Sequence, residues 1–250
     1  MKLKGINIMK RANIYGLLFI FLIIISYPLL LVYVPSAKVW NLIREDGIIE
    51  NLQVVFPFMA ACLFFYIFFK SKSKKEKYLF GTKRNYFYLL LGIFSLIIVG
   101  EEINWGQRLF NMNTPDWIFE KGLVEEINVH NQGPLFYLFG IPVTAGRIYF
   151  LACILFFLFI PIVNQVSRKA KDFFQLISLP IVPIFIAIYF MVNISSWQIA
   201  DKFLNINNRW KDLPEYAFGQ TAMEIYEIYF AIVLFWSSIC FFTTYKRSMS

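Results

Sequence analysis

In a chain of 250 residues, 58% of the side chains are hydrophobic, 20% are aromatic, and the mean hydropathy is +0.58. This composition excludes an ordinary soluble domain and is typical of an integral membrane protein. The net charge of +8 would indicate a nucleic acid partner in a soluble protein, but in a membrane protein the positions of the charges carry the information.

Apolar runs long enough to cross a bilayer occur six times along the chain. A hydrocarbon core about 30 Å thick needs roughly 20 residues in a helix. We therefore predict an all-α, polytopic membrane protein of about six transmembrane helices, in which residues 1–250 form a single membrane domain. The predicted spans are approximately 13–34, 48–69, 85–103, 147–166, 173–193 and 221–243.

The first run has a signal peptide as its alternative interpretation, because basic residues precede it. At about twenty residues it is longer than the roughly 7 to 15 apolar residues at the core of a signal peptide. Pro35 also occupies the −3 position of the candidate cleavage site at Ser36-Ala37. A retained span is therefore the prediction.

Basic residues gather in the segments that lie inside when the N-terminus is placed in the cytoplasm. These segments hold sixteen of the 24 Lys and Arg residues and only two of the 16 acidic residues. An excess of Lys and Arg in cytoplasmic segments is the positive-inside rule. We expect both termini inside, the long loops 103–146 and 194–220 on the outer face, and membrane lipids rather than nucleic acid as partners. Richness in Ile, Lys, Asn and Phe is compatible with a bacterium, so the expected location is the bacterial cytoplasmic (inner) membrane.

Several residues near or inside the spans have structural interpretations. Pro57, Pro180 and Pro183 are expected to kink their helices, because proline removes one backbone donor. Trp105-Gly106 is expected to anchor and bend the end of the third span. The three cysteines show no spacing typical of zinc or of a disulfide framework, so apolar packing is expected for all of them.

The loop after the third predicted span carries two local signals. Thr114-Pro115-Asp116 is typical of a helix start and Gly122 of a stop, which predicts a short interfacial helix over 115–121. After Gly133-Pro134, the apolar stretch 135–145 is too short to cross the membrane. We expect this stretch to be re-entrant or packed against the helix bundle.

Polar side chains gather at the outer ends of the predicted spans. Carboxylates and amides are costly to place in hydrocarbon, so each needs water or a partner. Positions 220, 224 and 227 share one face of a helix. We therefore predict one outward-facing polar pocket. Its members are Glu50, Asn51 and Gln53 in the second span, Glu101 and Glu102 in the third, Asn193, Ser195, Ser196 and Gln198 in the fifth, and Gln220, Glu224 and Glu227 in the sixth.

The only histidine lies in the long outer loop, four residues after Glu126. A spacing of four places Glu126 and His130 on one side of a helix and also of a strand. Such a pair can bind a divalent cation, or transfer protons through a glutamate whose pKa is raised by its surroundings. No metalloprotease or catalytic serine motif accompanies the pair. One histidine also cannot supply the multi-histidine zinc site of ceramidase-like or adiponectin-receptor-like hydrolases.

These patterns assign candidate roles to the polar residues. The cofactor is unknown, with a divalent cation as the candidate. The candidate catalytic residues are Glu102, Glu126, His130 and Glu227, and the candidate metal ligands are Glu102, Glu126 and His130. The candidate ligand-binding residues are Glu50, Gln53, Glu101, Trp105, Gln107, Arg108, Asn128, Asn131 and Glu224.

Each candidate has a structural alternative. Glu101 and Glu102 are equally compatible with a helix end that emerges into water, and Arg108 shares the face of Glu101 if the helix continues, which favours a surface ion pair. A single histidine in an outer loop is more often a hydrogen-bonding surface group than a ligand. Binding is favoured for Glu224 and Glu227, because water is harder to reach inside the span.

Two segments carry a resemblance to a known family. Glu101-Glu102-Ile103-Asn104-Trp105-Gly106-Gln107-Arg108, followed by Glu126-Ile127-Asn128-Val129-His130-Asn131, resembles a family of small bacterial polytopic membrane proteins to which no activity is assigned. The resemblance covers about the central third of the chain. It implies no reaction, only that one motif set contains Glu101, Glu102, Trp105, Gln107, Glu126, His130 and Asn131.

Three classes of function follow from these residues. The favoured one is a pocket that binds or processes a lipid-like, lipid-linked or cationic ligand at the outer leaflet; an enzyme of this kind would be an intramembrane hydrolase or transferase using Glu/His acid–base or metal chemistry. The second is an ion- or proton-coupled transporter, although the inner halves of the spans lack a polar lining. The third is a non-catalytic scaffold or assembly partner, whose polar cluster only locks helices together.

Overall fold

The structure, a computed structural model, describes residues 16–43, 47–71, 78, 81–107, 110, 112, 134–204 and 210–249. The chain is mostly helical. Five helices among the described residues are long and apolar enough to cross a membrane, which agrees with the predicted class of a polytopic helical membrane protein. They lie in the ranges Gly16–Tyr33, Ser36–Lys70 (whose long described helix is Ile48–Lys70), Ala145–Val166, Ile184–Phe203 and Ala217–Arg247.

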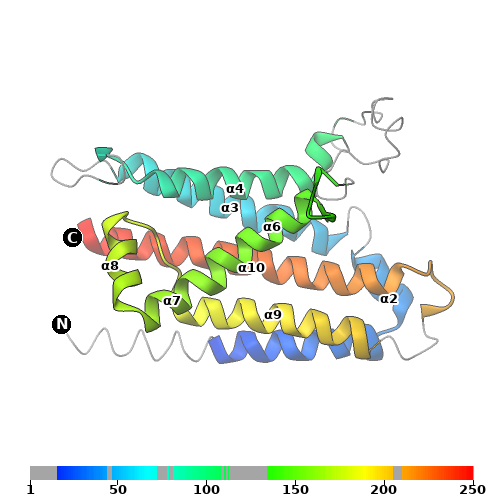
Figure 1. Cartoon of the computed structure of the whole chain (residues 1–250). Coiled ribbons are helices and arrows are strands. Elements are labelled where there is room, and N and C mark those ends of the chain that lie inside the picture. Colours follow the sequence, from blue (N-terminus) through cyan, green and yellow to red (C-terminus); the bar gives the residue numbers. More distant parts are fainter. Residues whose placement is uncertain are drawn as a thin grey trace. The chain divides into compact units, whose positions relative to one another are not determined.

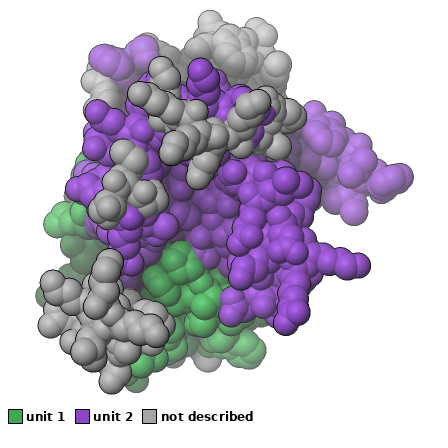
Figure 2. Space-filling view, turned by 90° about the vertical axis from the view of Figure 1, so that its left-hand side faces the viewer, with its two compact units in different colours: residues 1–53, 183–233 green, residues 54–182, 234–250 purple. Residues whose placement is uncertain are grey.

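The chain divides into two compact units, which Figure 2 shows in different colours. The first unit contains residues 1–53 and 183–233, and the second contains residues 54–182 and 234–250. The boundaries fall within α3 (Ile48–Lys70) and α10 (Ala217–Met249). The single membrane domain stays a prediction.

The first unit is built around the helix Gly16–Tyr33, which lies beside α9 (Ile184–Phe203) in Figure 1. Aromatic rings connect them to α10: the ring of Phe19 lies 5.7 Å from those of Tyr189 and Tyr229, edge to face in both pairs. This geometry is favoured by the charge distribution of aromatic rings. The same core includes α2 (Ser36–Ile43), which buries Val39 and Ile43.

The first helix ends in a π-helical turn, η1 (Leu29–Tyr33), which directly follows Pro28. Carbonyl groups in the last turn of a helix have no donor within the helix, and the residue four positions after Leu31 is Pro35, which has no N–H. One of them is used, because Trp210 Nε1 donates to the carbonyl oxygen of Leu31 at 3.2 Å. This bond ties the segment before α10 to the end of the first helix.

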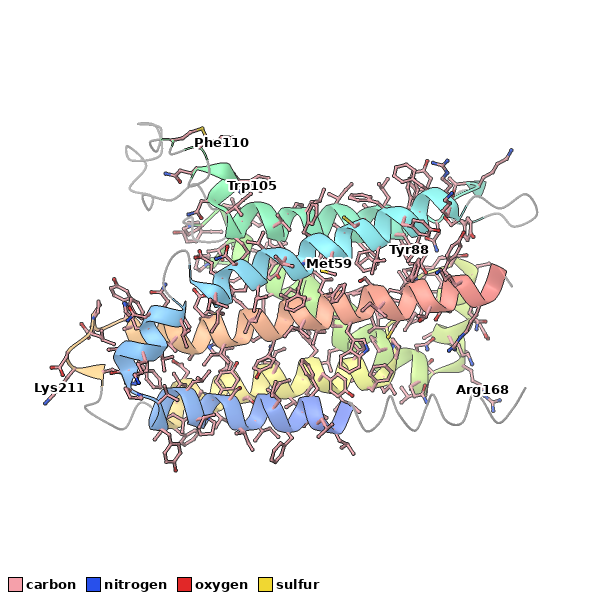
Figure 3. The ribbon with its side chains drawn as sticks, turned by 180° about the vertical axis from the view of Figure 1, so that it is seen from behind. Met59, Tyr88, Trp105, Phe110, Arg168 and Lys211 are labelled. Atoms are coloured by element: carbon pink, nitrogen blue, oxygen red, sulfur yellow. The ribbon has the colours of Figure 1, made fainter. Side chains whose placement is uncertain are left out.

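The second unit packs α4 (Tyr86–Glu102) beside the part of α3 that belongs to it, as Figure 1 and Figure 3 both show. The side chain of Asn85 caps α4 by accepting from Phe87 N at 3.1 Å. Gly92 allows the close approach, since a Cβ there would lie 2.7 Å from the ring of Phe65. At 17 residues, α4 is at the lower limit for a transmembrane helix.

The fourth predicted span forms one helical run from α6 (Ala145–Cys153) through the π-helical η4 (Ile154–Phe159) to α7 (Ile160–Val166). The π-turn ends two residues before Pro161, whose ring would clash with a carbonyl in a regular α-helix. Ser167 then caps α8 (Arg168–Leu176), a short amphipathic helix that buries none of its residues.

The fifth predicted span, 173–193, is wrong by about ten residues at each end. Residues 173–176 belong to α8, residues 177–183 are not helical, and the apolar helix is α9, Ile184–Phe203. The reason is the pair Pro180 and Pro183, because proline disfavours the helical conformation of the residue before it. These prolines end one helix and begin the next instead of kinking a span, whereas Pro57 does lie inside α3.

The stretch 135–145 holds the strands of a described chain that is otherwise mostly helical, and only its predicted packing against the bundle is wrong. It contains an antiparallel hairpin of β1 (Phe136–Leu138) and β2 (Ile141–Val143), and its side chains are largely exposed rather than packed on a bundle. The turn residues Phe139 and Gly140 have φ values of 50° and 79°. Positive φ at both positions matches the right-handed twist of a two-residue hairpin. Three-residue strands are too short to show an alternating pattern in the sequence.

Candidate functional site

Two hydrogen-bonded groups in the first unit are together named the buried polar cluster here: the buried Gln53 with the half-buried Glu224, and Tyr27 with Asn193 and the backbone oxygen of Tyr226. They come from four helices, namely Gly16–Tyr33, α3, α9 and α10. The side chains of Gln53 and Asn193 are 1% and 0% exposed. Amides buried this deeply in an apolar bundle require partners, so the hydrogen bonds of the cluster decide what it does.

Gln53 is bonded at only one end of its amide. Its Nε2 donates to Glu224 Oε2 at 2.9 Å and to the backbone oxygen of Glu224 at 3.1 Å. The opposite orientation of the amide would set its oxygen against the carboxylate, so the network decides the orientation. Gln53 Oε1 is buried and has no hydrogen-bond partner among the residues that the structure describes. An unsatisfied buried acceptor costs about 1 to 3 kcal/mol.

Asn193 joins three helices. It accepts from Tyr27 OH at 3.3 Å and donates through Nδ2 to the backbone oxygen of Tyr226 at 2.9 Å. Trp197, one turn further along α9, packs its ring 5.3 Å from that of Tyr226. Asn193 lies in the middle of α9 and not at its end, because the helix begins eleven residues later and ends ten residues later than the sequence predicted.

The predicted acidic face of the sixth span lies on a helix, as expected. α10 contains Gln220, Glu224 and Glu227, of which Gln220 is exposed and the two glutamates are half-buried. The carboxylate of Glu227 is close enough to Tyr27 for the two side chains to interact electrostatically. Glu50 is half-buried in the first turn of α3, where the partial positive charge of a helix N-terminus stabilises a carboxylate.

The glutamate pair of the third span ends α4 in the second unit. Asn104, Trp105 and Gly106 follow with φ values of 48°, 53° and 88°, which form a left-handed turn. Trp105 Nε1 donates to Glu101 Oε1 at 2.6 Å, at the end of α4 in Figure 3. The ring packs on Gly100, since a Cβ there would lie 2.9 Å from it. The predicted bend at Trp105-Gly106 is therefore present, and Glu101 helps to hold it.

Replacing Gly106 with Ala should lower the free energy of unfolding by about 1 to 2 kcal/mol, because a side chain disfavours the left-handed region. The new Cβ would also lie 3.1 Å from the ring of Phe110. The measurement is the thermal unfolding midpoint in detergent. Gly219→Ala is the matched control, since nothing lies within 4 Å of its Cβ position. Equal midpoints for the two variants would contradict a strained turn.

Part of the predicted site lies outside the described residues: Arg108, Glu126, Asn128, His130 and Asn131, and with them the predicted helix 115–121. The predicted metal set of Glu102, Glu126 and His130 is therefore described only at Glu102, a half-buried residue at the end of α4. Within the described ranges, no three His, Cys, Asp or Glu side chains are grouped to hold a metal ion. Gln107 is half-buried just after the turn. The single pocket uniting both units stays a prediction.

Sequence reasoning missed Tyr27 as a site residue and placed Asn193 at a helix end. The signal for Asn193 was present, because an amide inside an apolar run is costly unless it is paired. The misplaced boundary of the fifth span hid this signal by assigning Asn193 to the membrane surface. Tyr27 carried no signal, since a tyrosine near the end of a span is ordinary.

The chain was also compared with known proteins. No protein-family model, no curated protein and no solved structure matches it.

Proposed function

We propose that this integral membrane protein binds the polar head of a lipid-like, lipid-linked or cationic ligand at the outer leaflet, through the buried polar cluster of the first unit. The observation that supports this function best is Gln53 Oε1, a buried acceptor without a partner among the described residues. It lies on the same amide that is anchored by Glu224, so its direction is held by two hydrogen bonds. A preorganised acceptor of this kind favours binding over a purely structural role.

The chemistry of the cluster favours a donor-bearing ligand. Carbonyl and carboxylate oxygens accept hydrogen bonds from ammonium or hydroxyl groups and also bind hard cations. The described residues of the first unit carry six acidic and three basic side chains, a balance that attracts positive charge. The basic residues are Lys38, Lys202 and Lys211, and the acidic residues are Glu50, Asp201, Asp212, Glu215, Glu224 and Glu227.

The outward orientation rests on the charge distribution of the chain. In this proposal α4 is a sixth crossing, and both termini and the basic segments lie inside, as the positive-inside rule favours. The proposed location is the bacterial cytoplasmic membrane. Membership of the family that the segment 101–108 resembles is also proposed. Because α9 continues to Phe203, the outer loop before α10 is shorter than the predicted 194–220.

Reporters fused at Ser73 and at Ser248 should both be found on the cytoplasmic side, because basic segments surround both positions. Paired alkaline phosphatase and fluorescent protein fusions, whose activities depend on opposite sides of the membrane, provide the measurement. A fusion at Lys211 should give the opposite result. An external signal at Ser73 or Ser248 would overturn the orientation.

Binding itself is tested by analysing what remains on the protein after purification in mild detergent. Lipid mass spectrometry should find one lipid class enriched over its share of the host membrane, or elemental analysis should find one cation at a fixed ratio to protein. Either result supports a binding site that accepts donors or cations. A preparation with a bulk lipid profile and no stoichiometric cation would contradict the proposal.

The scaffold is the second candidate function, and the bonds of Asn193 favour it. Polar side chains that bond across helices stabilise membrane bundles without binding anything. A catalytic site would respond differently from a scaffold: Glu102→Gln, Glu126→Gln and His130→Ala would abolish function while the folded protein persisted. Equal losses of folded protein in all three variants would support the scaffold instead.

A further inference from the structure

The hairpin formed by β1 and β2 has apolar side chains on both of its faces. In the register of the two strands, the pairs Phe136–Val143 and Leu138–Ile141 lie on one face of the hairpin. The pair Tyr137–Pro142 lies on the other face. A hairpin that packs one face on protein and turns the other to water alternates apolar and polar residues. This hairpin lacks the polar face, and its tip is Phe139, which is 96% exposed.

The backbone of β2 leaves few polar groups open at its edge. Pro142 has no N–H, and its carbonyl oxygen accepts a hydrogen bond from the guanidinium group of Arg147. At the base of the hairpin, Leu135 N donates to Val143 O at 2.8 Å. Because β2 has no free N–H group at Pro142, this edge resists pairing with another strand. The free energy cost of moving the edge out of water is also lower.

The position of the hairpin in the chain places it at the end of a membrane helix. One residue, Thr144, separates β2 from α6, and its hydroxyl caps α6 by accepting from Arg147 N at 3.2 Å. α6 begins the apolar helix Ala145–Val166, so no linker can carry the hairpin away from the bilayer edge. An isolated two-stranded hairpin is marginal in water and needs further support.

We propose that the hairpin is a lipid-anchoring element, which inserts Phe139 and its neighbours into the leaflet at the N-terminal end of the helix Ala145–Val166. Lipid is the occupant because the exposed apolar hairpin is followed along the chain by the exposed Ile148 and Leu151 of α6, in a helix apolar and long enough to cross a membrane. Tyr137 and Arg147 combine an apolar stem with a polar end, which suits the headgroup region. The element holds the start of α6 at a fixed depth and does not depend on ligand binding by the polar cluster.

A spin label at the tip tests this proposal in the full chain, reconstituted into phosphatidylcholine and phosphatidylglycerol vesicles. Cys62 and Cys240 are replaced by Ala, and Cys153 is kept because it is buried. Phe139→Cys then carries a nitroxide, with Ile141→Cys as a second position on the hairpin and Lys211→Cys as the control. Lys211 is exposed and points away from the helices in Figure 3.

Oxygen concentrates in lipid and nickel ethylenediaminediacetate stays in water, so their collision rates with the label report its surroundings. We expect the ratio of oxygen to nickel collisions to be several-fold higher at positions 139 and 141 than at 211. Equal ratios would place the hairpin in water and overturn the proposal. Low collision rates with both reagents would show that protein covers the hairpin, which also overturns it, and spin–spin broadening would then identify a second copy of the chain as the cover.

Discussion

Replacing Glu224 with Gln should remove the co-purifying ligand from the protein while leaving its thermal stability unchanged. The new amide still has an oxygen that can accept from Gln53 Nε2. A hydrogen bond therefore replaces the bond of 2.9 Å between Gln53 Nε2 and Glu224 Oε2. The charge is lost, and the new N–H group competes with the ligand for Gln53 Oε1. A hydrogen bond to a charged group contributes about 1.5 to 3 kcal/mol, so ligand retention should fall roughly ten- to a hundredfold.

The measurement is the amount of ligand per protein, determined by lipid mass spectrometry and elemental analysis as for the wild type. Glu215→Gln is the matched control, because it removes the same charge from an exposed position in the same unit. Unchanged ligand in Glu224→Gln would contradict a binding role for the cluster. A parallel loss in both variants would show that the net charge of the unit, and not the site, retains the ligand.

Replacing Asn193 with Leu should lower the free energy of unfolding by about 1 to 2 kcal/mol, because the change leaves Tyr27 OH without its acceptor in a buried setting. The measurement is equilibrium unfolding of the purified protein in mixed detergent and denaturing surfactant. The same substitution at Asn51, which is exposed on α3, should change stability by less than about 0.5 kcal/mol.

A double-mutant cycle separates the hydrogen bond from the change of shape. Tyr27→Phe removes only the hydroxyl group, and in the wild type it should cost part of the loss seen in Asn193→Leu. In the background of Asn193→Leu, the hydroxyl has no acceptor to lose, so its removal should cost nothing or restore stability. If the losses of unfolding free energy in the two single variants add up in the double variant, the hydrogen bond between Tyr27 and Asn193 does not contribute to stability.

The end of α4 could be predicted from the residues next to it in the sequence. The sequence placed Glu101 and Glu102 at the end of an apolar helix and expected Trp105-Gly106 to bend it, and the helix does end at Glu102 before a left-handed turn. These features were predictable because the groups that interact are within one or two turns of each other. The bond from Trp105 Nε1 to Glu101 Oε1 spans only four residues.

The effect of Pro180 and Pro183 could not be predicted from the residues next to them in the sequence. The apolar run starts at Phe173, near the end of α8, and continues through residues 177–183 into α9, so the sequence predicted one span with kinks. Whether a proline kinks a helix or separates two helices depends on whether neighbouring groups satisfy the freed backbone. Here the carbonyl oxygen of Ser178 accepts from Asn85 Nδ2 at 2.7 Å, a partner 93 residues away.

Composition and hydropathy were enough to predict the membrane class and the helical character of the spans, because a chain in lipid must be apolar and must satisfy its backbone within each helix. They also indicated which residues were too polar for their surroundings, among them Gln53 and Glu224. Which of these residues bond to one another depends on the tertiary structure. Gln53 bonds to Glu224 across 171 residues of sequence and Tyr27 to Asn193 across 166, and such pairings follow from how helices pack, which no local pattern encodes.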